Sequence, residues 1–189
     1  MEFFDAIERR QSIRQFEPTA VEWDKLMQVL GAANRAPSAG NLQAYRIFVM
    51  REPWERQVLA RAAGDQRHVA EAPLALVFCV DPARSAARYG ARGEQLYCIQ
   101  DATIACAYAQ LAAASLELAS VWIGTILEPE VVRASLGITE DLWPIALLLI
   151  GYPAEAPIRP PRRDLQDLVS GLRPDEWAAL PQRKETGPR

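Results

Sequence analysis

A long apolar segment without helix breakers is the feature that most constrains the fold of this chain. Segment 97–118, YCIQDATIACAYAQLAAASLEL, contains no Gly or Pro and corresponds to about six helical turns. Large apolar side chains recur in it at helical spacing, while the other faces carry mostly Ala and Cys. A helix that is apolar nearly all round has to be covered on every side. We therefore expect a central helix, and we hypothesise that one edge meets the same helix of a second subunit.

Composition and charge limit the classes of protein to which the chain can belong. With 189 residues, of which 50% are hydrophobic and 24% charged, it suits one ordinary globular domain. A net charge of -3 disfavours nucleic acid or an anionic membrane as the main partner. The N-terminal segment lacks the order of a signal peptide, and no run approaches the roughly 18 apolar residues of a membrane span. We expect a cytoplasmic protein that binds neither nucleic acid nor membrane.

Several familiar motifs are missing from the sequence. Cys79, Cys98 and Cys106 lie in apolar segments without the spacing of metal or redox sites, so we expect buried, reduced thiols and no metal site. No Gly-x-Gly-x-x-Gly fingerprint is present, which disfavours a Rossmann dinucleotide domain.

Four apolar segments have the character of strands: 45–50, 74–80, 120–126 and 145–150. They alternate with helical patterns, which indicates a single α+β domain over residues 1–189. From about residue 153 the chain is rich in proline, and we expect a stiff, extended C-terminal arm, followed by a small helix over 175–180.

The N-terminal segment carries residue types that bind phosphate. A short amphipathic helix is expected from Glu2 to Arg10, followed by Ser12 and Arg14 in the sequence RRQSIR. Guanidinium groups can grip an anion at two points, and a serine hydroxyl adds a further donor. The alternative is a solvated charged face.

A loop of small and amide-bearing residues follows the second expected helix. That helix starts in a capping box formed by Thr19 and Glu22, and Pro37 should end it. The loop then reads Pro37-Ser38-Ala39-Gly40-Asn41-Leu42-Gln43. Such a loop can wrap backbone and side-chain amides around a planar polar ligand. The alternative is an ordinary turn between a helix and a strand.

Four segments together resemble the FMN-dependent nitroreductase family. RRQSIRQF and APSAGNLQAYR resemble its first half, and YCIQDATIACAYAQLAAASLELASVWIGTI and PIALLLIGYP resemble its second half in the same order. The resemblance runs from about Phe3 to Leu168. It implies a mostly antiparallel central sheet flanked by helices, with the long central helix at a homodimer interface.

The resemblance also assigns site residues. Arg10, Ser12 and Arg14 match the motif that holds the FMN phosphate and neighbouring polar groups. The loop matches the segment that meets the flavin ring and ribityl chain, and family members build each flavin site from two subunits. Near flavin N5 the resemblance places the backbone of Gly124 and Thr125, with no catalytic side chain. The full set of implied cofactor-binding residues is Arg10, Ser12, Arg14, Pro37, Ser38, Ala39, Asn41, Gln43, Trp122, Ile123, Gly124, Thr125, Arg162 and Arg163.

The chemistry implied by the resemblance belongs to the cofactor. NAD(P)H would deliver hydride to flavin N5, leave, and be replaced by a small-molecule electron acceptor such as a quinone or nitroaromatic, in a ping-pong cycle. Two alternatives remain open: specialised flavin chemistry on the same scaffold (dehalogenation, azoline oxidation or flavin cleavage), and a non-catalytic flavin-binding dimer.

Four further features of the sequence concern single residues or short segments. His68 could be an acid-base group, although we favour a surface or capping histidine. Segment 81–93 could be a lid or a nicotinamide-phosphate site, with a solvated loop as the default. Asp101 should be structural, either capping or salt-bridged. Relatives commonly have a Gly-Leu-Gly type ending where this chain has Glu117-Leu118-Ala119, so the central helix has to end differently.

Overall fold

The computed structural model describes residues 2–126, 128–138, 141–157 and 159–178, in two compact units that comprise residues 1–157 and 158–189. The second unit contains a short helical turn, η3 (Leu165–Asp167), and the helix α8 (Pro174–Ala178). The small helix expected over 175–180 corresponds to α8, and its last two positions lie outside the described residues.

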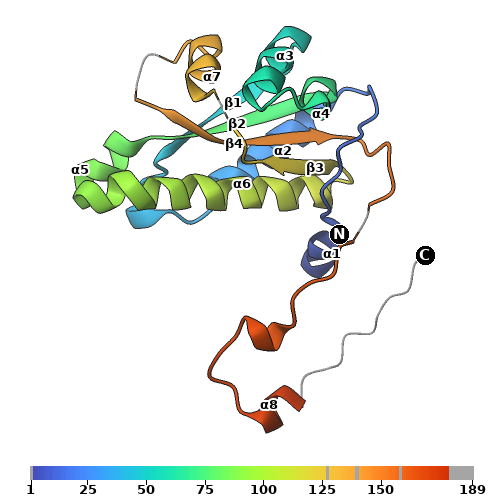
Figure 1. Ribbon diagram of the computed structural model, residues 1–189, viewed down its shortest axis with the longest axis vertical. Coiled ribbons are helices and arrows are strands. Elements are labelled where there is room, and N and C mark those ends of the chain that lie inside the picture. Colours follow the sequence, from blue (N-terminus) through green and yellow to red (C-terminus); the bar gives the residue numbers. More distant parts are fainter. Residues whose placement is uncertain (1, 127, 139–140, 158, 179–189) are drawn as a thin grey trace. The chain divides into compact units, whose positions relative to one another are not determined.

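A four-stranded antiparallel sheet forms the centre of the first unit (Figure 1). Its spatial order is β1 (Tyr45–Met50), β2 (Leu74–Val80), β4 (Trp143–Gly151) and β3 (Ala119–Ile123). The α+β fold class is therefore confirmed. The first two strands have the expected bounds, β4 is longer than expected at both ends, and β3 ends before Gly124.

Helices cover both faces of this sheet. Figure 1 shows α3 (Pro53–Ala62), α4 (Arg67–Glu71) and α7 (Pro129–Ser135) on one side and the long helix α6 (Cys98–Ser115) on the other. The helix α2 (Trp23–Asn34) packs in the same core as α6. Three further elements complete the unit: α1 (Phe3–Arg9), α5 (Pro82–Arg92) and a π-helical turn, η2 (Gly93–Tyr97), that leads into α6.

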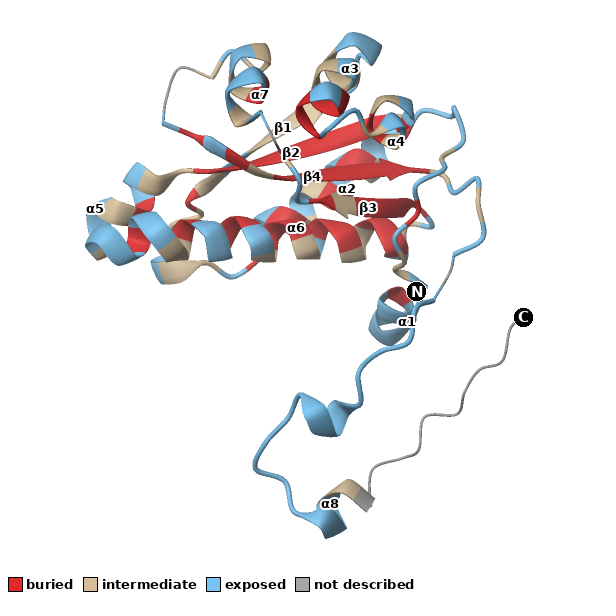
Figure 2. Cartoon of the chain, viewed as in Figure 1, coloured by how far each residue is buried: buried red, intermediate tan, exposed pale blue. Residues whose placement is uncertain are grey.

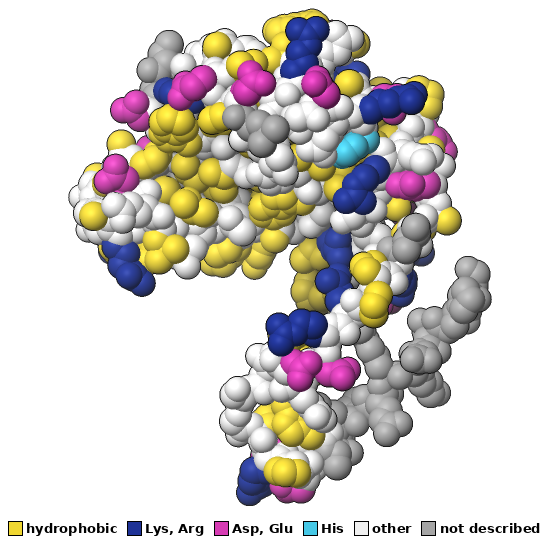
Figure 3. All heavy atoms as spheres, viewed as in Figure 1, with side chains coloured by type: hydrophobic (Ala, Val, Ile, Leu, Met, Phe, Trp, Pro, Cys, Tyr) yellow, Lys and Arg dark blue, Asp and Glu magenta, His cyan; other side chains and the backbone are white. Residues whose placement is uncertain are grey.

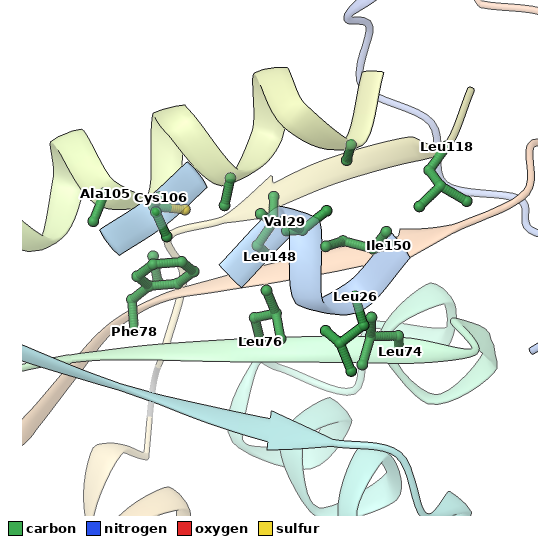
Figure 4. Packing of buried hydrophobic residues seen from close by; sticks show 14 of the residues in the cluster. Leu26, Val29, Leu74, Leu76, Phe78, Ala105, Cys106, Leu118, Leu148 and Ile150 are labelled. Carbon is green, nitrogen blue, oxygen red and sulfur yellow. The ribbon is translucent and has the colours of Figure 1, made fainter. Parts of the chain in front are cut away.

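Successive side chains of each strand point to opposite faces of the sheet, which produces two large hydrophobic cores, one on each face. Leu74, Leu76 and Phe78 of β2 face α2 and α6, whereas the residues between them face α3, α4 and α7. Figure 4 shows Phe78 beside Ala105 and Cys106 of α6, with Leu26 and Val29 of α2 over the neighbouring part of the sheet. Because both faces are covered, β2 is buried along its whole length (Figure 2).

The expected central helix is confirmed as α6. Small buried side chains along one side, including Ala102, Ala105, Ala109 and Ala113, let its backbone approach the sheet closely. Its opposite side is not covered by the described part of this chain, because 42% of Ile99 and 41% of Tyr108 are exposed. The N-terminal helix α1 is also as expected, but its apolar residues Phe3 and Phe4 are 62% and 77% exposed.

All three cysteines are buried and unbridged, as expected. Burial raises the pKa of Cys79 to about 12 and raises the pKa values of Cys98 and Cys106, so the thiols are neutral at physiological pH. In the described segments, no group of three or more potential ligands is arranged to hold a metal ion. No helix among the described residues has the length and hydrophobicity to cross a bilayer.

The capping box expected from Thr19 and Glu22 is wrong. The helix α2 begins at Trp23, and Glu22 occupies its N-cap position without a side-chain cap bond. The Glu22 carboxylate is used elsewhere, because it accepts a hydrogen bond from the Tyr152 hydroxyl at 2.7 Å. That bond lowers the pKa of Glu22.

The default of a solvated loop over 81–93 is also wrong, because most of this segment forms α5. Asp81 caps the helix by accepting a hydrogen bond from the Arg84 backbone N–H at 2.9 Å, and Pro82 stands at the first helical position, where it is tolerated. The helix is interrupted only at Gly90, which has a φ of 58°.

The C-terminal end of α6 uses a glutamate where helices usually place glycine. Glu117 has a φ of 64°, in the left-handed region. The Leu118 N–H donates to the Ala113 carbonyl at 3.0 Å, and the Glu117 N–H donates to the Ala114 carbonyl at 3.3 Å. These two bonds form a Schellman motif, the standard helix ending, at a position where a side chain costs roughly 1 kcal/mol.

We predict that Glu117→Gly stabilises the protein by up to about 1 kcal/mol, because glycine adopts a left-handed backbone without steric cost. Chemical denaturation of both proteins measures the change. Ser115→Gly is the matched control: Ser115 lies inside the last turn of α6, so this variant should lose about 0.5–1 kcal/mol. Equal destabilisation of the two variants would contradict the strain at Glu117.

Candidate functional site

The N-terminal motif runs beside the start of β3. Ser12 forms a bridge with Ser120, and the Ile13 N–H donates to the Ser120 carbonyl at 3.1 Å. Ile13 is only 4% exposed, whereas Ser12 and Arg14 on either side of it are exposed. The extended backbone therefore anchors the motif through one apolar side chain and presents its two polar side chains outward.

Glu155 fixes the motif from a distant part of the sequence. Its Oε1 atom accepts hydrogen bonds from the backbone N–H groups of Arg14 at 2.6 Å and Gln15 at 3.2 Å. Glu155 could not be predicted from the sequence, because nothing in the local pattern around residue 155 signals a partner so far away in the chain.

A hollow of about 200 Å³ lies next to the motif. Arg9, Arg10 and Gln11 line it on one side, and Ala114, Glu117 and Ser120 line it on another. Pockets that enclose small-molecule ligands usually measure about 300 Å³ or more. The hollow is thus too small to enclose a flavin nucleotide within the first unit alone.

The loop Ser38–Gln43 is held from beneath by a buried carboxylate. Asp101, which is 1% exposed, accepts hydrogen bonds from the backbone N–H of Ala39 at 2.8 Å and of Ala44 at 3.3 Å. The expected structural role of Asp101 is therefore confirmed, although it acts through two loop amides rather than through a helix cap or a salt bridge.

Within the loop, the side chains fix one another. The Gln43 amide nitrogen donates to Ser38 Oγ at 3.1 Å, to the Asn41 carbonyl at 2.6 Å and to Asn41 Oδ1 at 2.7 Å. Gly40, Asn41 and Gln43 all have positive φ values, of 55°, 57° and 46°. Such backbone is costly for residues other than Gly and persists where the surroundings enforce it, as at binding sites.

Helix α5 supports the same loop from outside, which the sequence analysis did not anticipate. Arg84 Nε donates to the Leu42 carbonyl at 2.5 Å, and Arg88 Nη1 donates to the Gly40 carbonyl at 3.1 Å. Gly40 has a φ of 55°, where other residues are strained, and a Cβ atom there would also displace the Tyr89 hydroxyl and the Arg88 guanidinium, so glycine is favoured at this position. In the sequence, the spacing of Arg84 and Arg88 by four residues was the available sign that both side chains lie on one face of a helix.

The backbone is exposed where the chain leaves β3, at Gly124 and Thr125. Trp122 packs partly against the core that contains α6, while the Ile123 side chain is buried in the opposite core. Any ligand contact of Ile123 would therefore come from its backbone. Gly124 and Thr125 are exposed, and neither backbone N–H donates to another described residue.

The expected basic pair at the C-terminus, Arg162 and Arg163, belongs to the second unit. Both residues are exposed, and Arg163 Nη2 donates to the Asp167 carbonyl at 3.1 Å within that unit.

The N-terminal motif and the loop Ser38–Gln43 lie at opposite ends of α6. The loop is tied to Asp101 in the first turn of the helix, whereas the motif shares its hollow with Ala114 and Glu117 at the other end. At 1.5 Å per residue, the path from Asp101 to Ala114 is about 20 Å. Within the first unit, the structure does not bring these two groups of residues together.

His68 lies in α4 and is neither a cap nor fully exposed. Its Nε2 atom is buried and has no hydrogen-bond partner among the described residues. Burial lowers the pKa of His68, and the positive charge of Arg14 lowers it further, while Glu71 and Glu155 oppose the shift. The neutral imidazole is therefore favoured in the folded protein.

We predict that His68 makes stability fall toward acidic pH. In the unfolded chain, a histidine has a pKa of about 6.5, which is higher than the pKa of His68 in the folded protein. The contribution of neutral His68 to the free energy of unfolding is therefore present above about pH 6.5 and is lost as the pH falls through the folded-state pKa. Urea denaturation between pH 8 and pH 5 should show a smaller decrease in the free energy of unfolding for His68→Gln than for the wild type. Parallel pH profiles would contradict the lowered pKa.

Comparison with known proteins identifies the class of protein that this fold defines. The model of the Nitroreductase family matches residues 7–65 and 50–152, and the chain belongs to that family. The resemblance in the sequence is thereby confirmed, and so is the antiparallel sheet flanked by helices that it implied.

Individual relatives agree with this assignment. The chain is 36% identical over 173 residues to a protein of Thermus thermophilus named NADH dehydrogenase, covering 78% of this chain and 84% of the relative. A nitroreductase family protein from Clostridium difficile 630 has a TM-score of 0.79 at 33% identity, with 90% of this chain and 98% of that chain covered. The NADPH:FMN oxidoreductase from Vibrio harveyi, solved with NAD+, has a TM-score of 0.81 at 26% identity, with 93% and 81% covered.

Proposed function

We propose that the protein is a homodimeric, cytoplasmic FMN-dependent oxidoreductase that uses NAD(P)H to reduce small-molecule acceptors such as quinones or nitroaromatics. Its membership of the Nitroreductase family carries this proposal. When bound, FMN would supply the two-electron redox chemistry that connects NAD(P)H with the acceptor in a ping-pong cycle. The protein residues bind and orient the participants.

The described residues suit this cofactor. The amides of Gly124 and Thr125, which donate to no other described residue, are donors that can hydrogen-bond to a flavin ring nitrogen. The fixed backbone of the loop Ser38–Gln43 offers further polar groups in a preorganised arrangement, which reduces the entropy lost on binding. Arg10, Ser12 and Arg14 supply donors for the phosphate.

A site shared by two subunits explains the separation of these groups. One end of α6 would supply the N-terminal motif from one subunit, and the other end would supply the loop from its partner. The uncovered side of α6 suits such an interface, since Asp101 is the only charged residue between Cys98 and Ser115 and it is buried. Figure 3 shows hydrophobic side chains gathered over this face of the molecule. Exposed apolar patches of this kind mark association sites.

We predict that the purified protein takes up FMN and becomes yellow, and that it oxidises NAD(P)H in the presence of menadione. Arg10→Ala and Arg162→Ala should each weaken FMN binding by on the order of 1.5–3 kcal/mol through loss of a charge-assisted hydrogen bond. Fluorescence titration with FMN measures both affinities. Failure of the wild type to bind FMN would refute the proposed function, and unchanged affinity in both variants would refute the phosphate assignment.

We also predict that two damaged chains complement each other. Arg10→Ala damages the motif, and Asp101→Asn weakens the anchor of the loop. In a mixed dimer, one of the two sites would combine an intact motif with an intact loop, while the other would carry both lesions. Mixing the two variants should therefore restore tight FMN binding at up to one site per mixed dimer, measured by titration. No recovery in a verified mixed dimer would show that each site is built from one chain.

A further inference from the structure

Helix α5 carries a positive surface that the proposed function does not yet use. Arg84, Arg88 and Arg92 are all exposed, and the helix contains no acidic residue. None of the three arginines forms an ion pair with another described residue. We call these residues the α5 arginine face. On a chain with a net charge of -3, an unneutralised group of this kind favours an anionic ligand.

Two tyrosines hold this face in a defined arrangement. The rings of Tyr89 and Tyr97 meet edge to face with their centroids 5.1 Å apart. The Arg88 guanidinium lies over the Tyr89 ring at 5.4 Å, and the Arg92 guanidinium lies over the Tyr97 ring at 5.6 Å. Each of the two arginines is therefore held against one ring of the same aromatic pair, on either side of the kink at Gly90. Stacked guanidinium groups still present their N–H donors in the plane, where a phosphate can bind.

These arginines retain donors for a ligand. Arg84 and Arg88 each donate one hydrogen bond to the loop, and Arg92 Nε donates to the Tyr97 hydroxyl at 3.1 Å. A guanidinium carries several more N–H groups, and their fork geometry matches two oxygens of a phosphate.

The location of the face relates it to the proposed reaction. Arg84 and Arg88 bind the carbonyls of Leu42 and Gly40, which flank Asn41 in the loop that would meet the flavin. The nicotinamide of the reductant has to reach the flavin, so the phosphates of the same molecule would lie on the surface around the flavin site, of which this loop is a part. A positive surface beside the loop stabilises those phosphates.

We propose that the α5 arginine face binds the phosphate groups of the dinucleotide reductant and makes the protein prefer NADPH, which carries an additional 2′-phosphate, over NADH. This inference rests on the proposed function. The extra phosphate brings further negative charge and oxygen acceptors, which Arg88 and Arg92 are placed to bind.

The first test measures binding without catalysis. Isothermal titration of the full-length protein with 2′,5′-ADP and with 5′-AMP should give at least about tenfold tighter binding of 2′,5′-ADP. Arg92 is the best position for substitution because, unlike Arg84 and Arg88, it has no bond to the loop. Arg92→Gln should weaken 2′,5′-ADP about tenfold, and Arg92→Lys should retain most of the affinity because the charge remains. Arg61→Gln, an exposed arginine on α3, is the matched control and should behave as the wild type.

The second test uses the FMN-loaded enzyme. The ratio of kcat/KM for NADPH to kcat/KM for NADH should exceed one in the wild type and fall about tenfold in Arg92→Gln, with unchanged FMN affinity. Equal binding of 2′,5′-ADP and 5′-AMP by the wild type would overturn the inference, as would unchanged 2′,5′-ADP affinity in both Arg88→Gln and Arg92→Gln. Absence of FMN binding would refute the proposed function instead, and the 2′,5′-ADP titration distinguishes the two failures because it needs no bound flavin.

Discussion

The buried carboxylate of Asp101 is the interaction on which the candidate site depends. A charge removed from water is costly unless hydrogen bonds compensate it, and two loop amides supply that compensation. The same two bonds attach the loop Ser38–Gln43 and the residue after it to the central helix α6. Three residues of this loop can therefore retain a left-handed backbone that would relax in an isolated peptide.

In the proposed dimeric site, the sheet and α6 would position two half-sites in each chain rather than one complete site. The motif is fixed by Ile13, by Ser120 and by Glu155, all near the C-terminal end of α6. The loop is fixed by Asp101 and by α5 near the other end. Each half is ordered by hydrogen bonds and packing within its own chain, so association would need little rearrangement.

Much of the fold could be predicted from the sequence because its signals are local. Mostly apolar segments predicted β1 and β2 with their bounds, and the absence of helix breakers predicted α6. The helix α5 was missed because its arginines and glycines resemble a solvated loop, although Asp81 followed by Pro82 was a usable helix start. Glu22 was misassigned because Tyr152, its actual partner, lies 130 positions away in the sequence.

The site residues were harder to predict, because sequence patterns contain no distances. The resemblance named the motif and the loop, but only the structure shows that one helix separates them. The contacts of Arg84 and Arg88 with the loop, and of Glu155 with the motif, join segments far apart in the chain. The helical spacing of the two arginines places them on one face of a helix but does not identify the loop as their partner. Tertiary contacts of this kind can be identified only once the chain is folded.

The 18 residues of α6 also fix the distance and the relative direction of the two proposed half-sites. Each residue of a helix turns the chain by about 100° and advances it by about 1.5 Å. Inserting or deleting one residue between Asp101 and Ala114 would therefore swing one half-site around the axis, so that it no longer faced the same direction as the other. Homologous chains that share this geometry should vary in length in their connecting loops and keep the length of this helix constant.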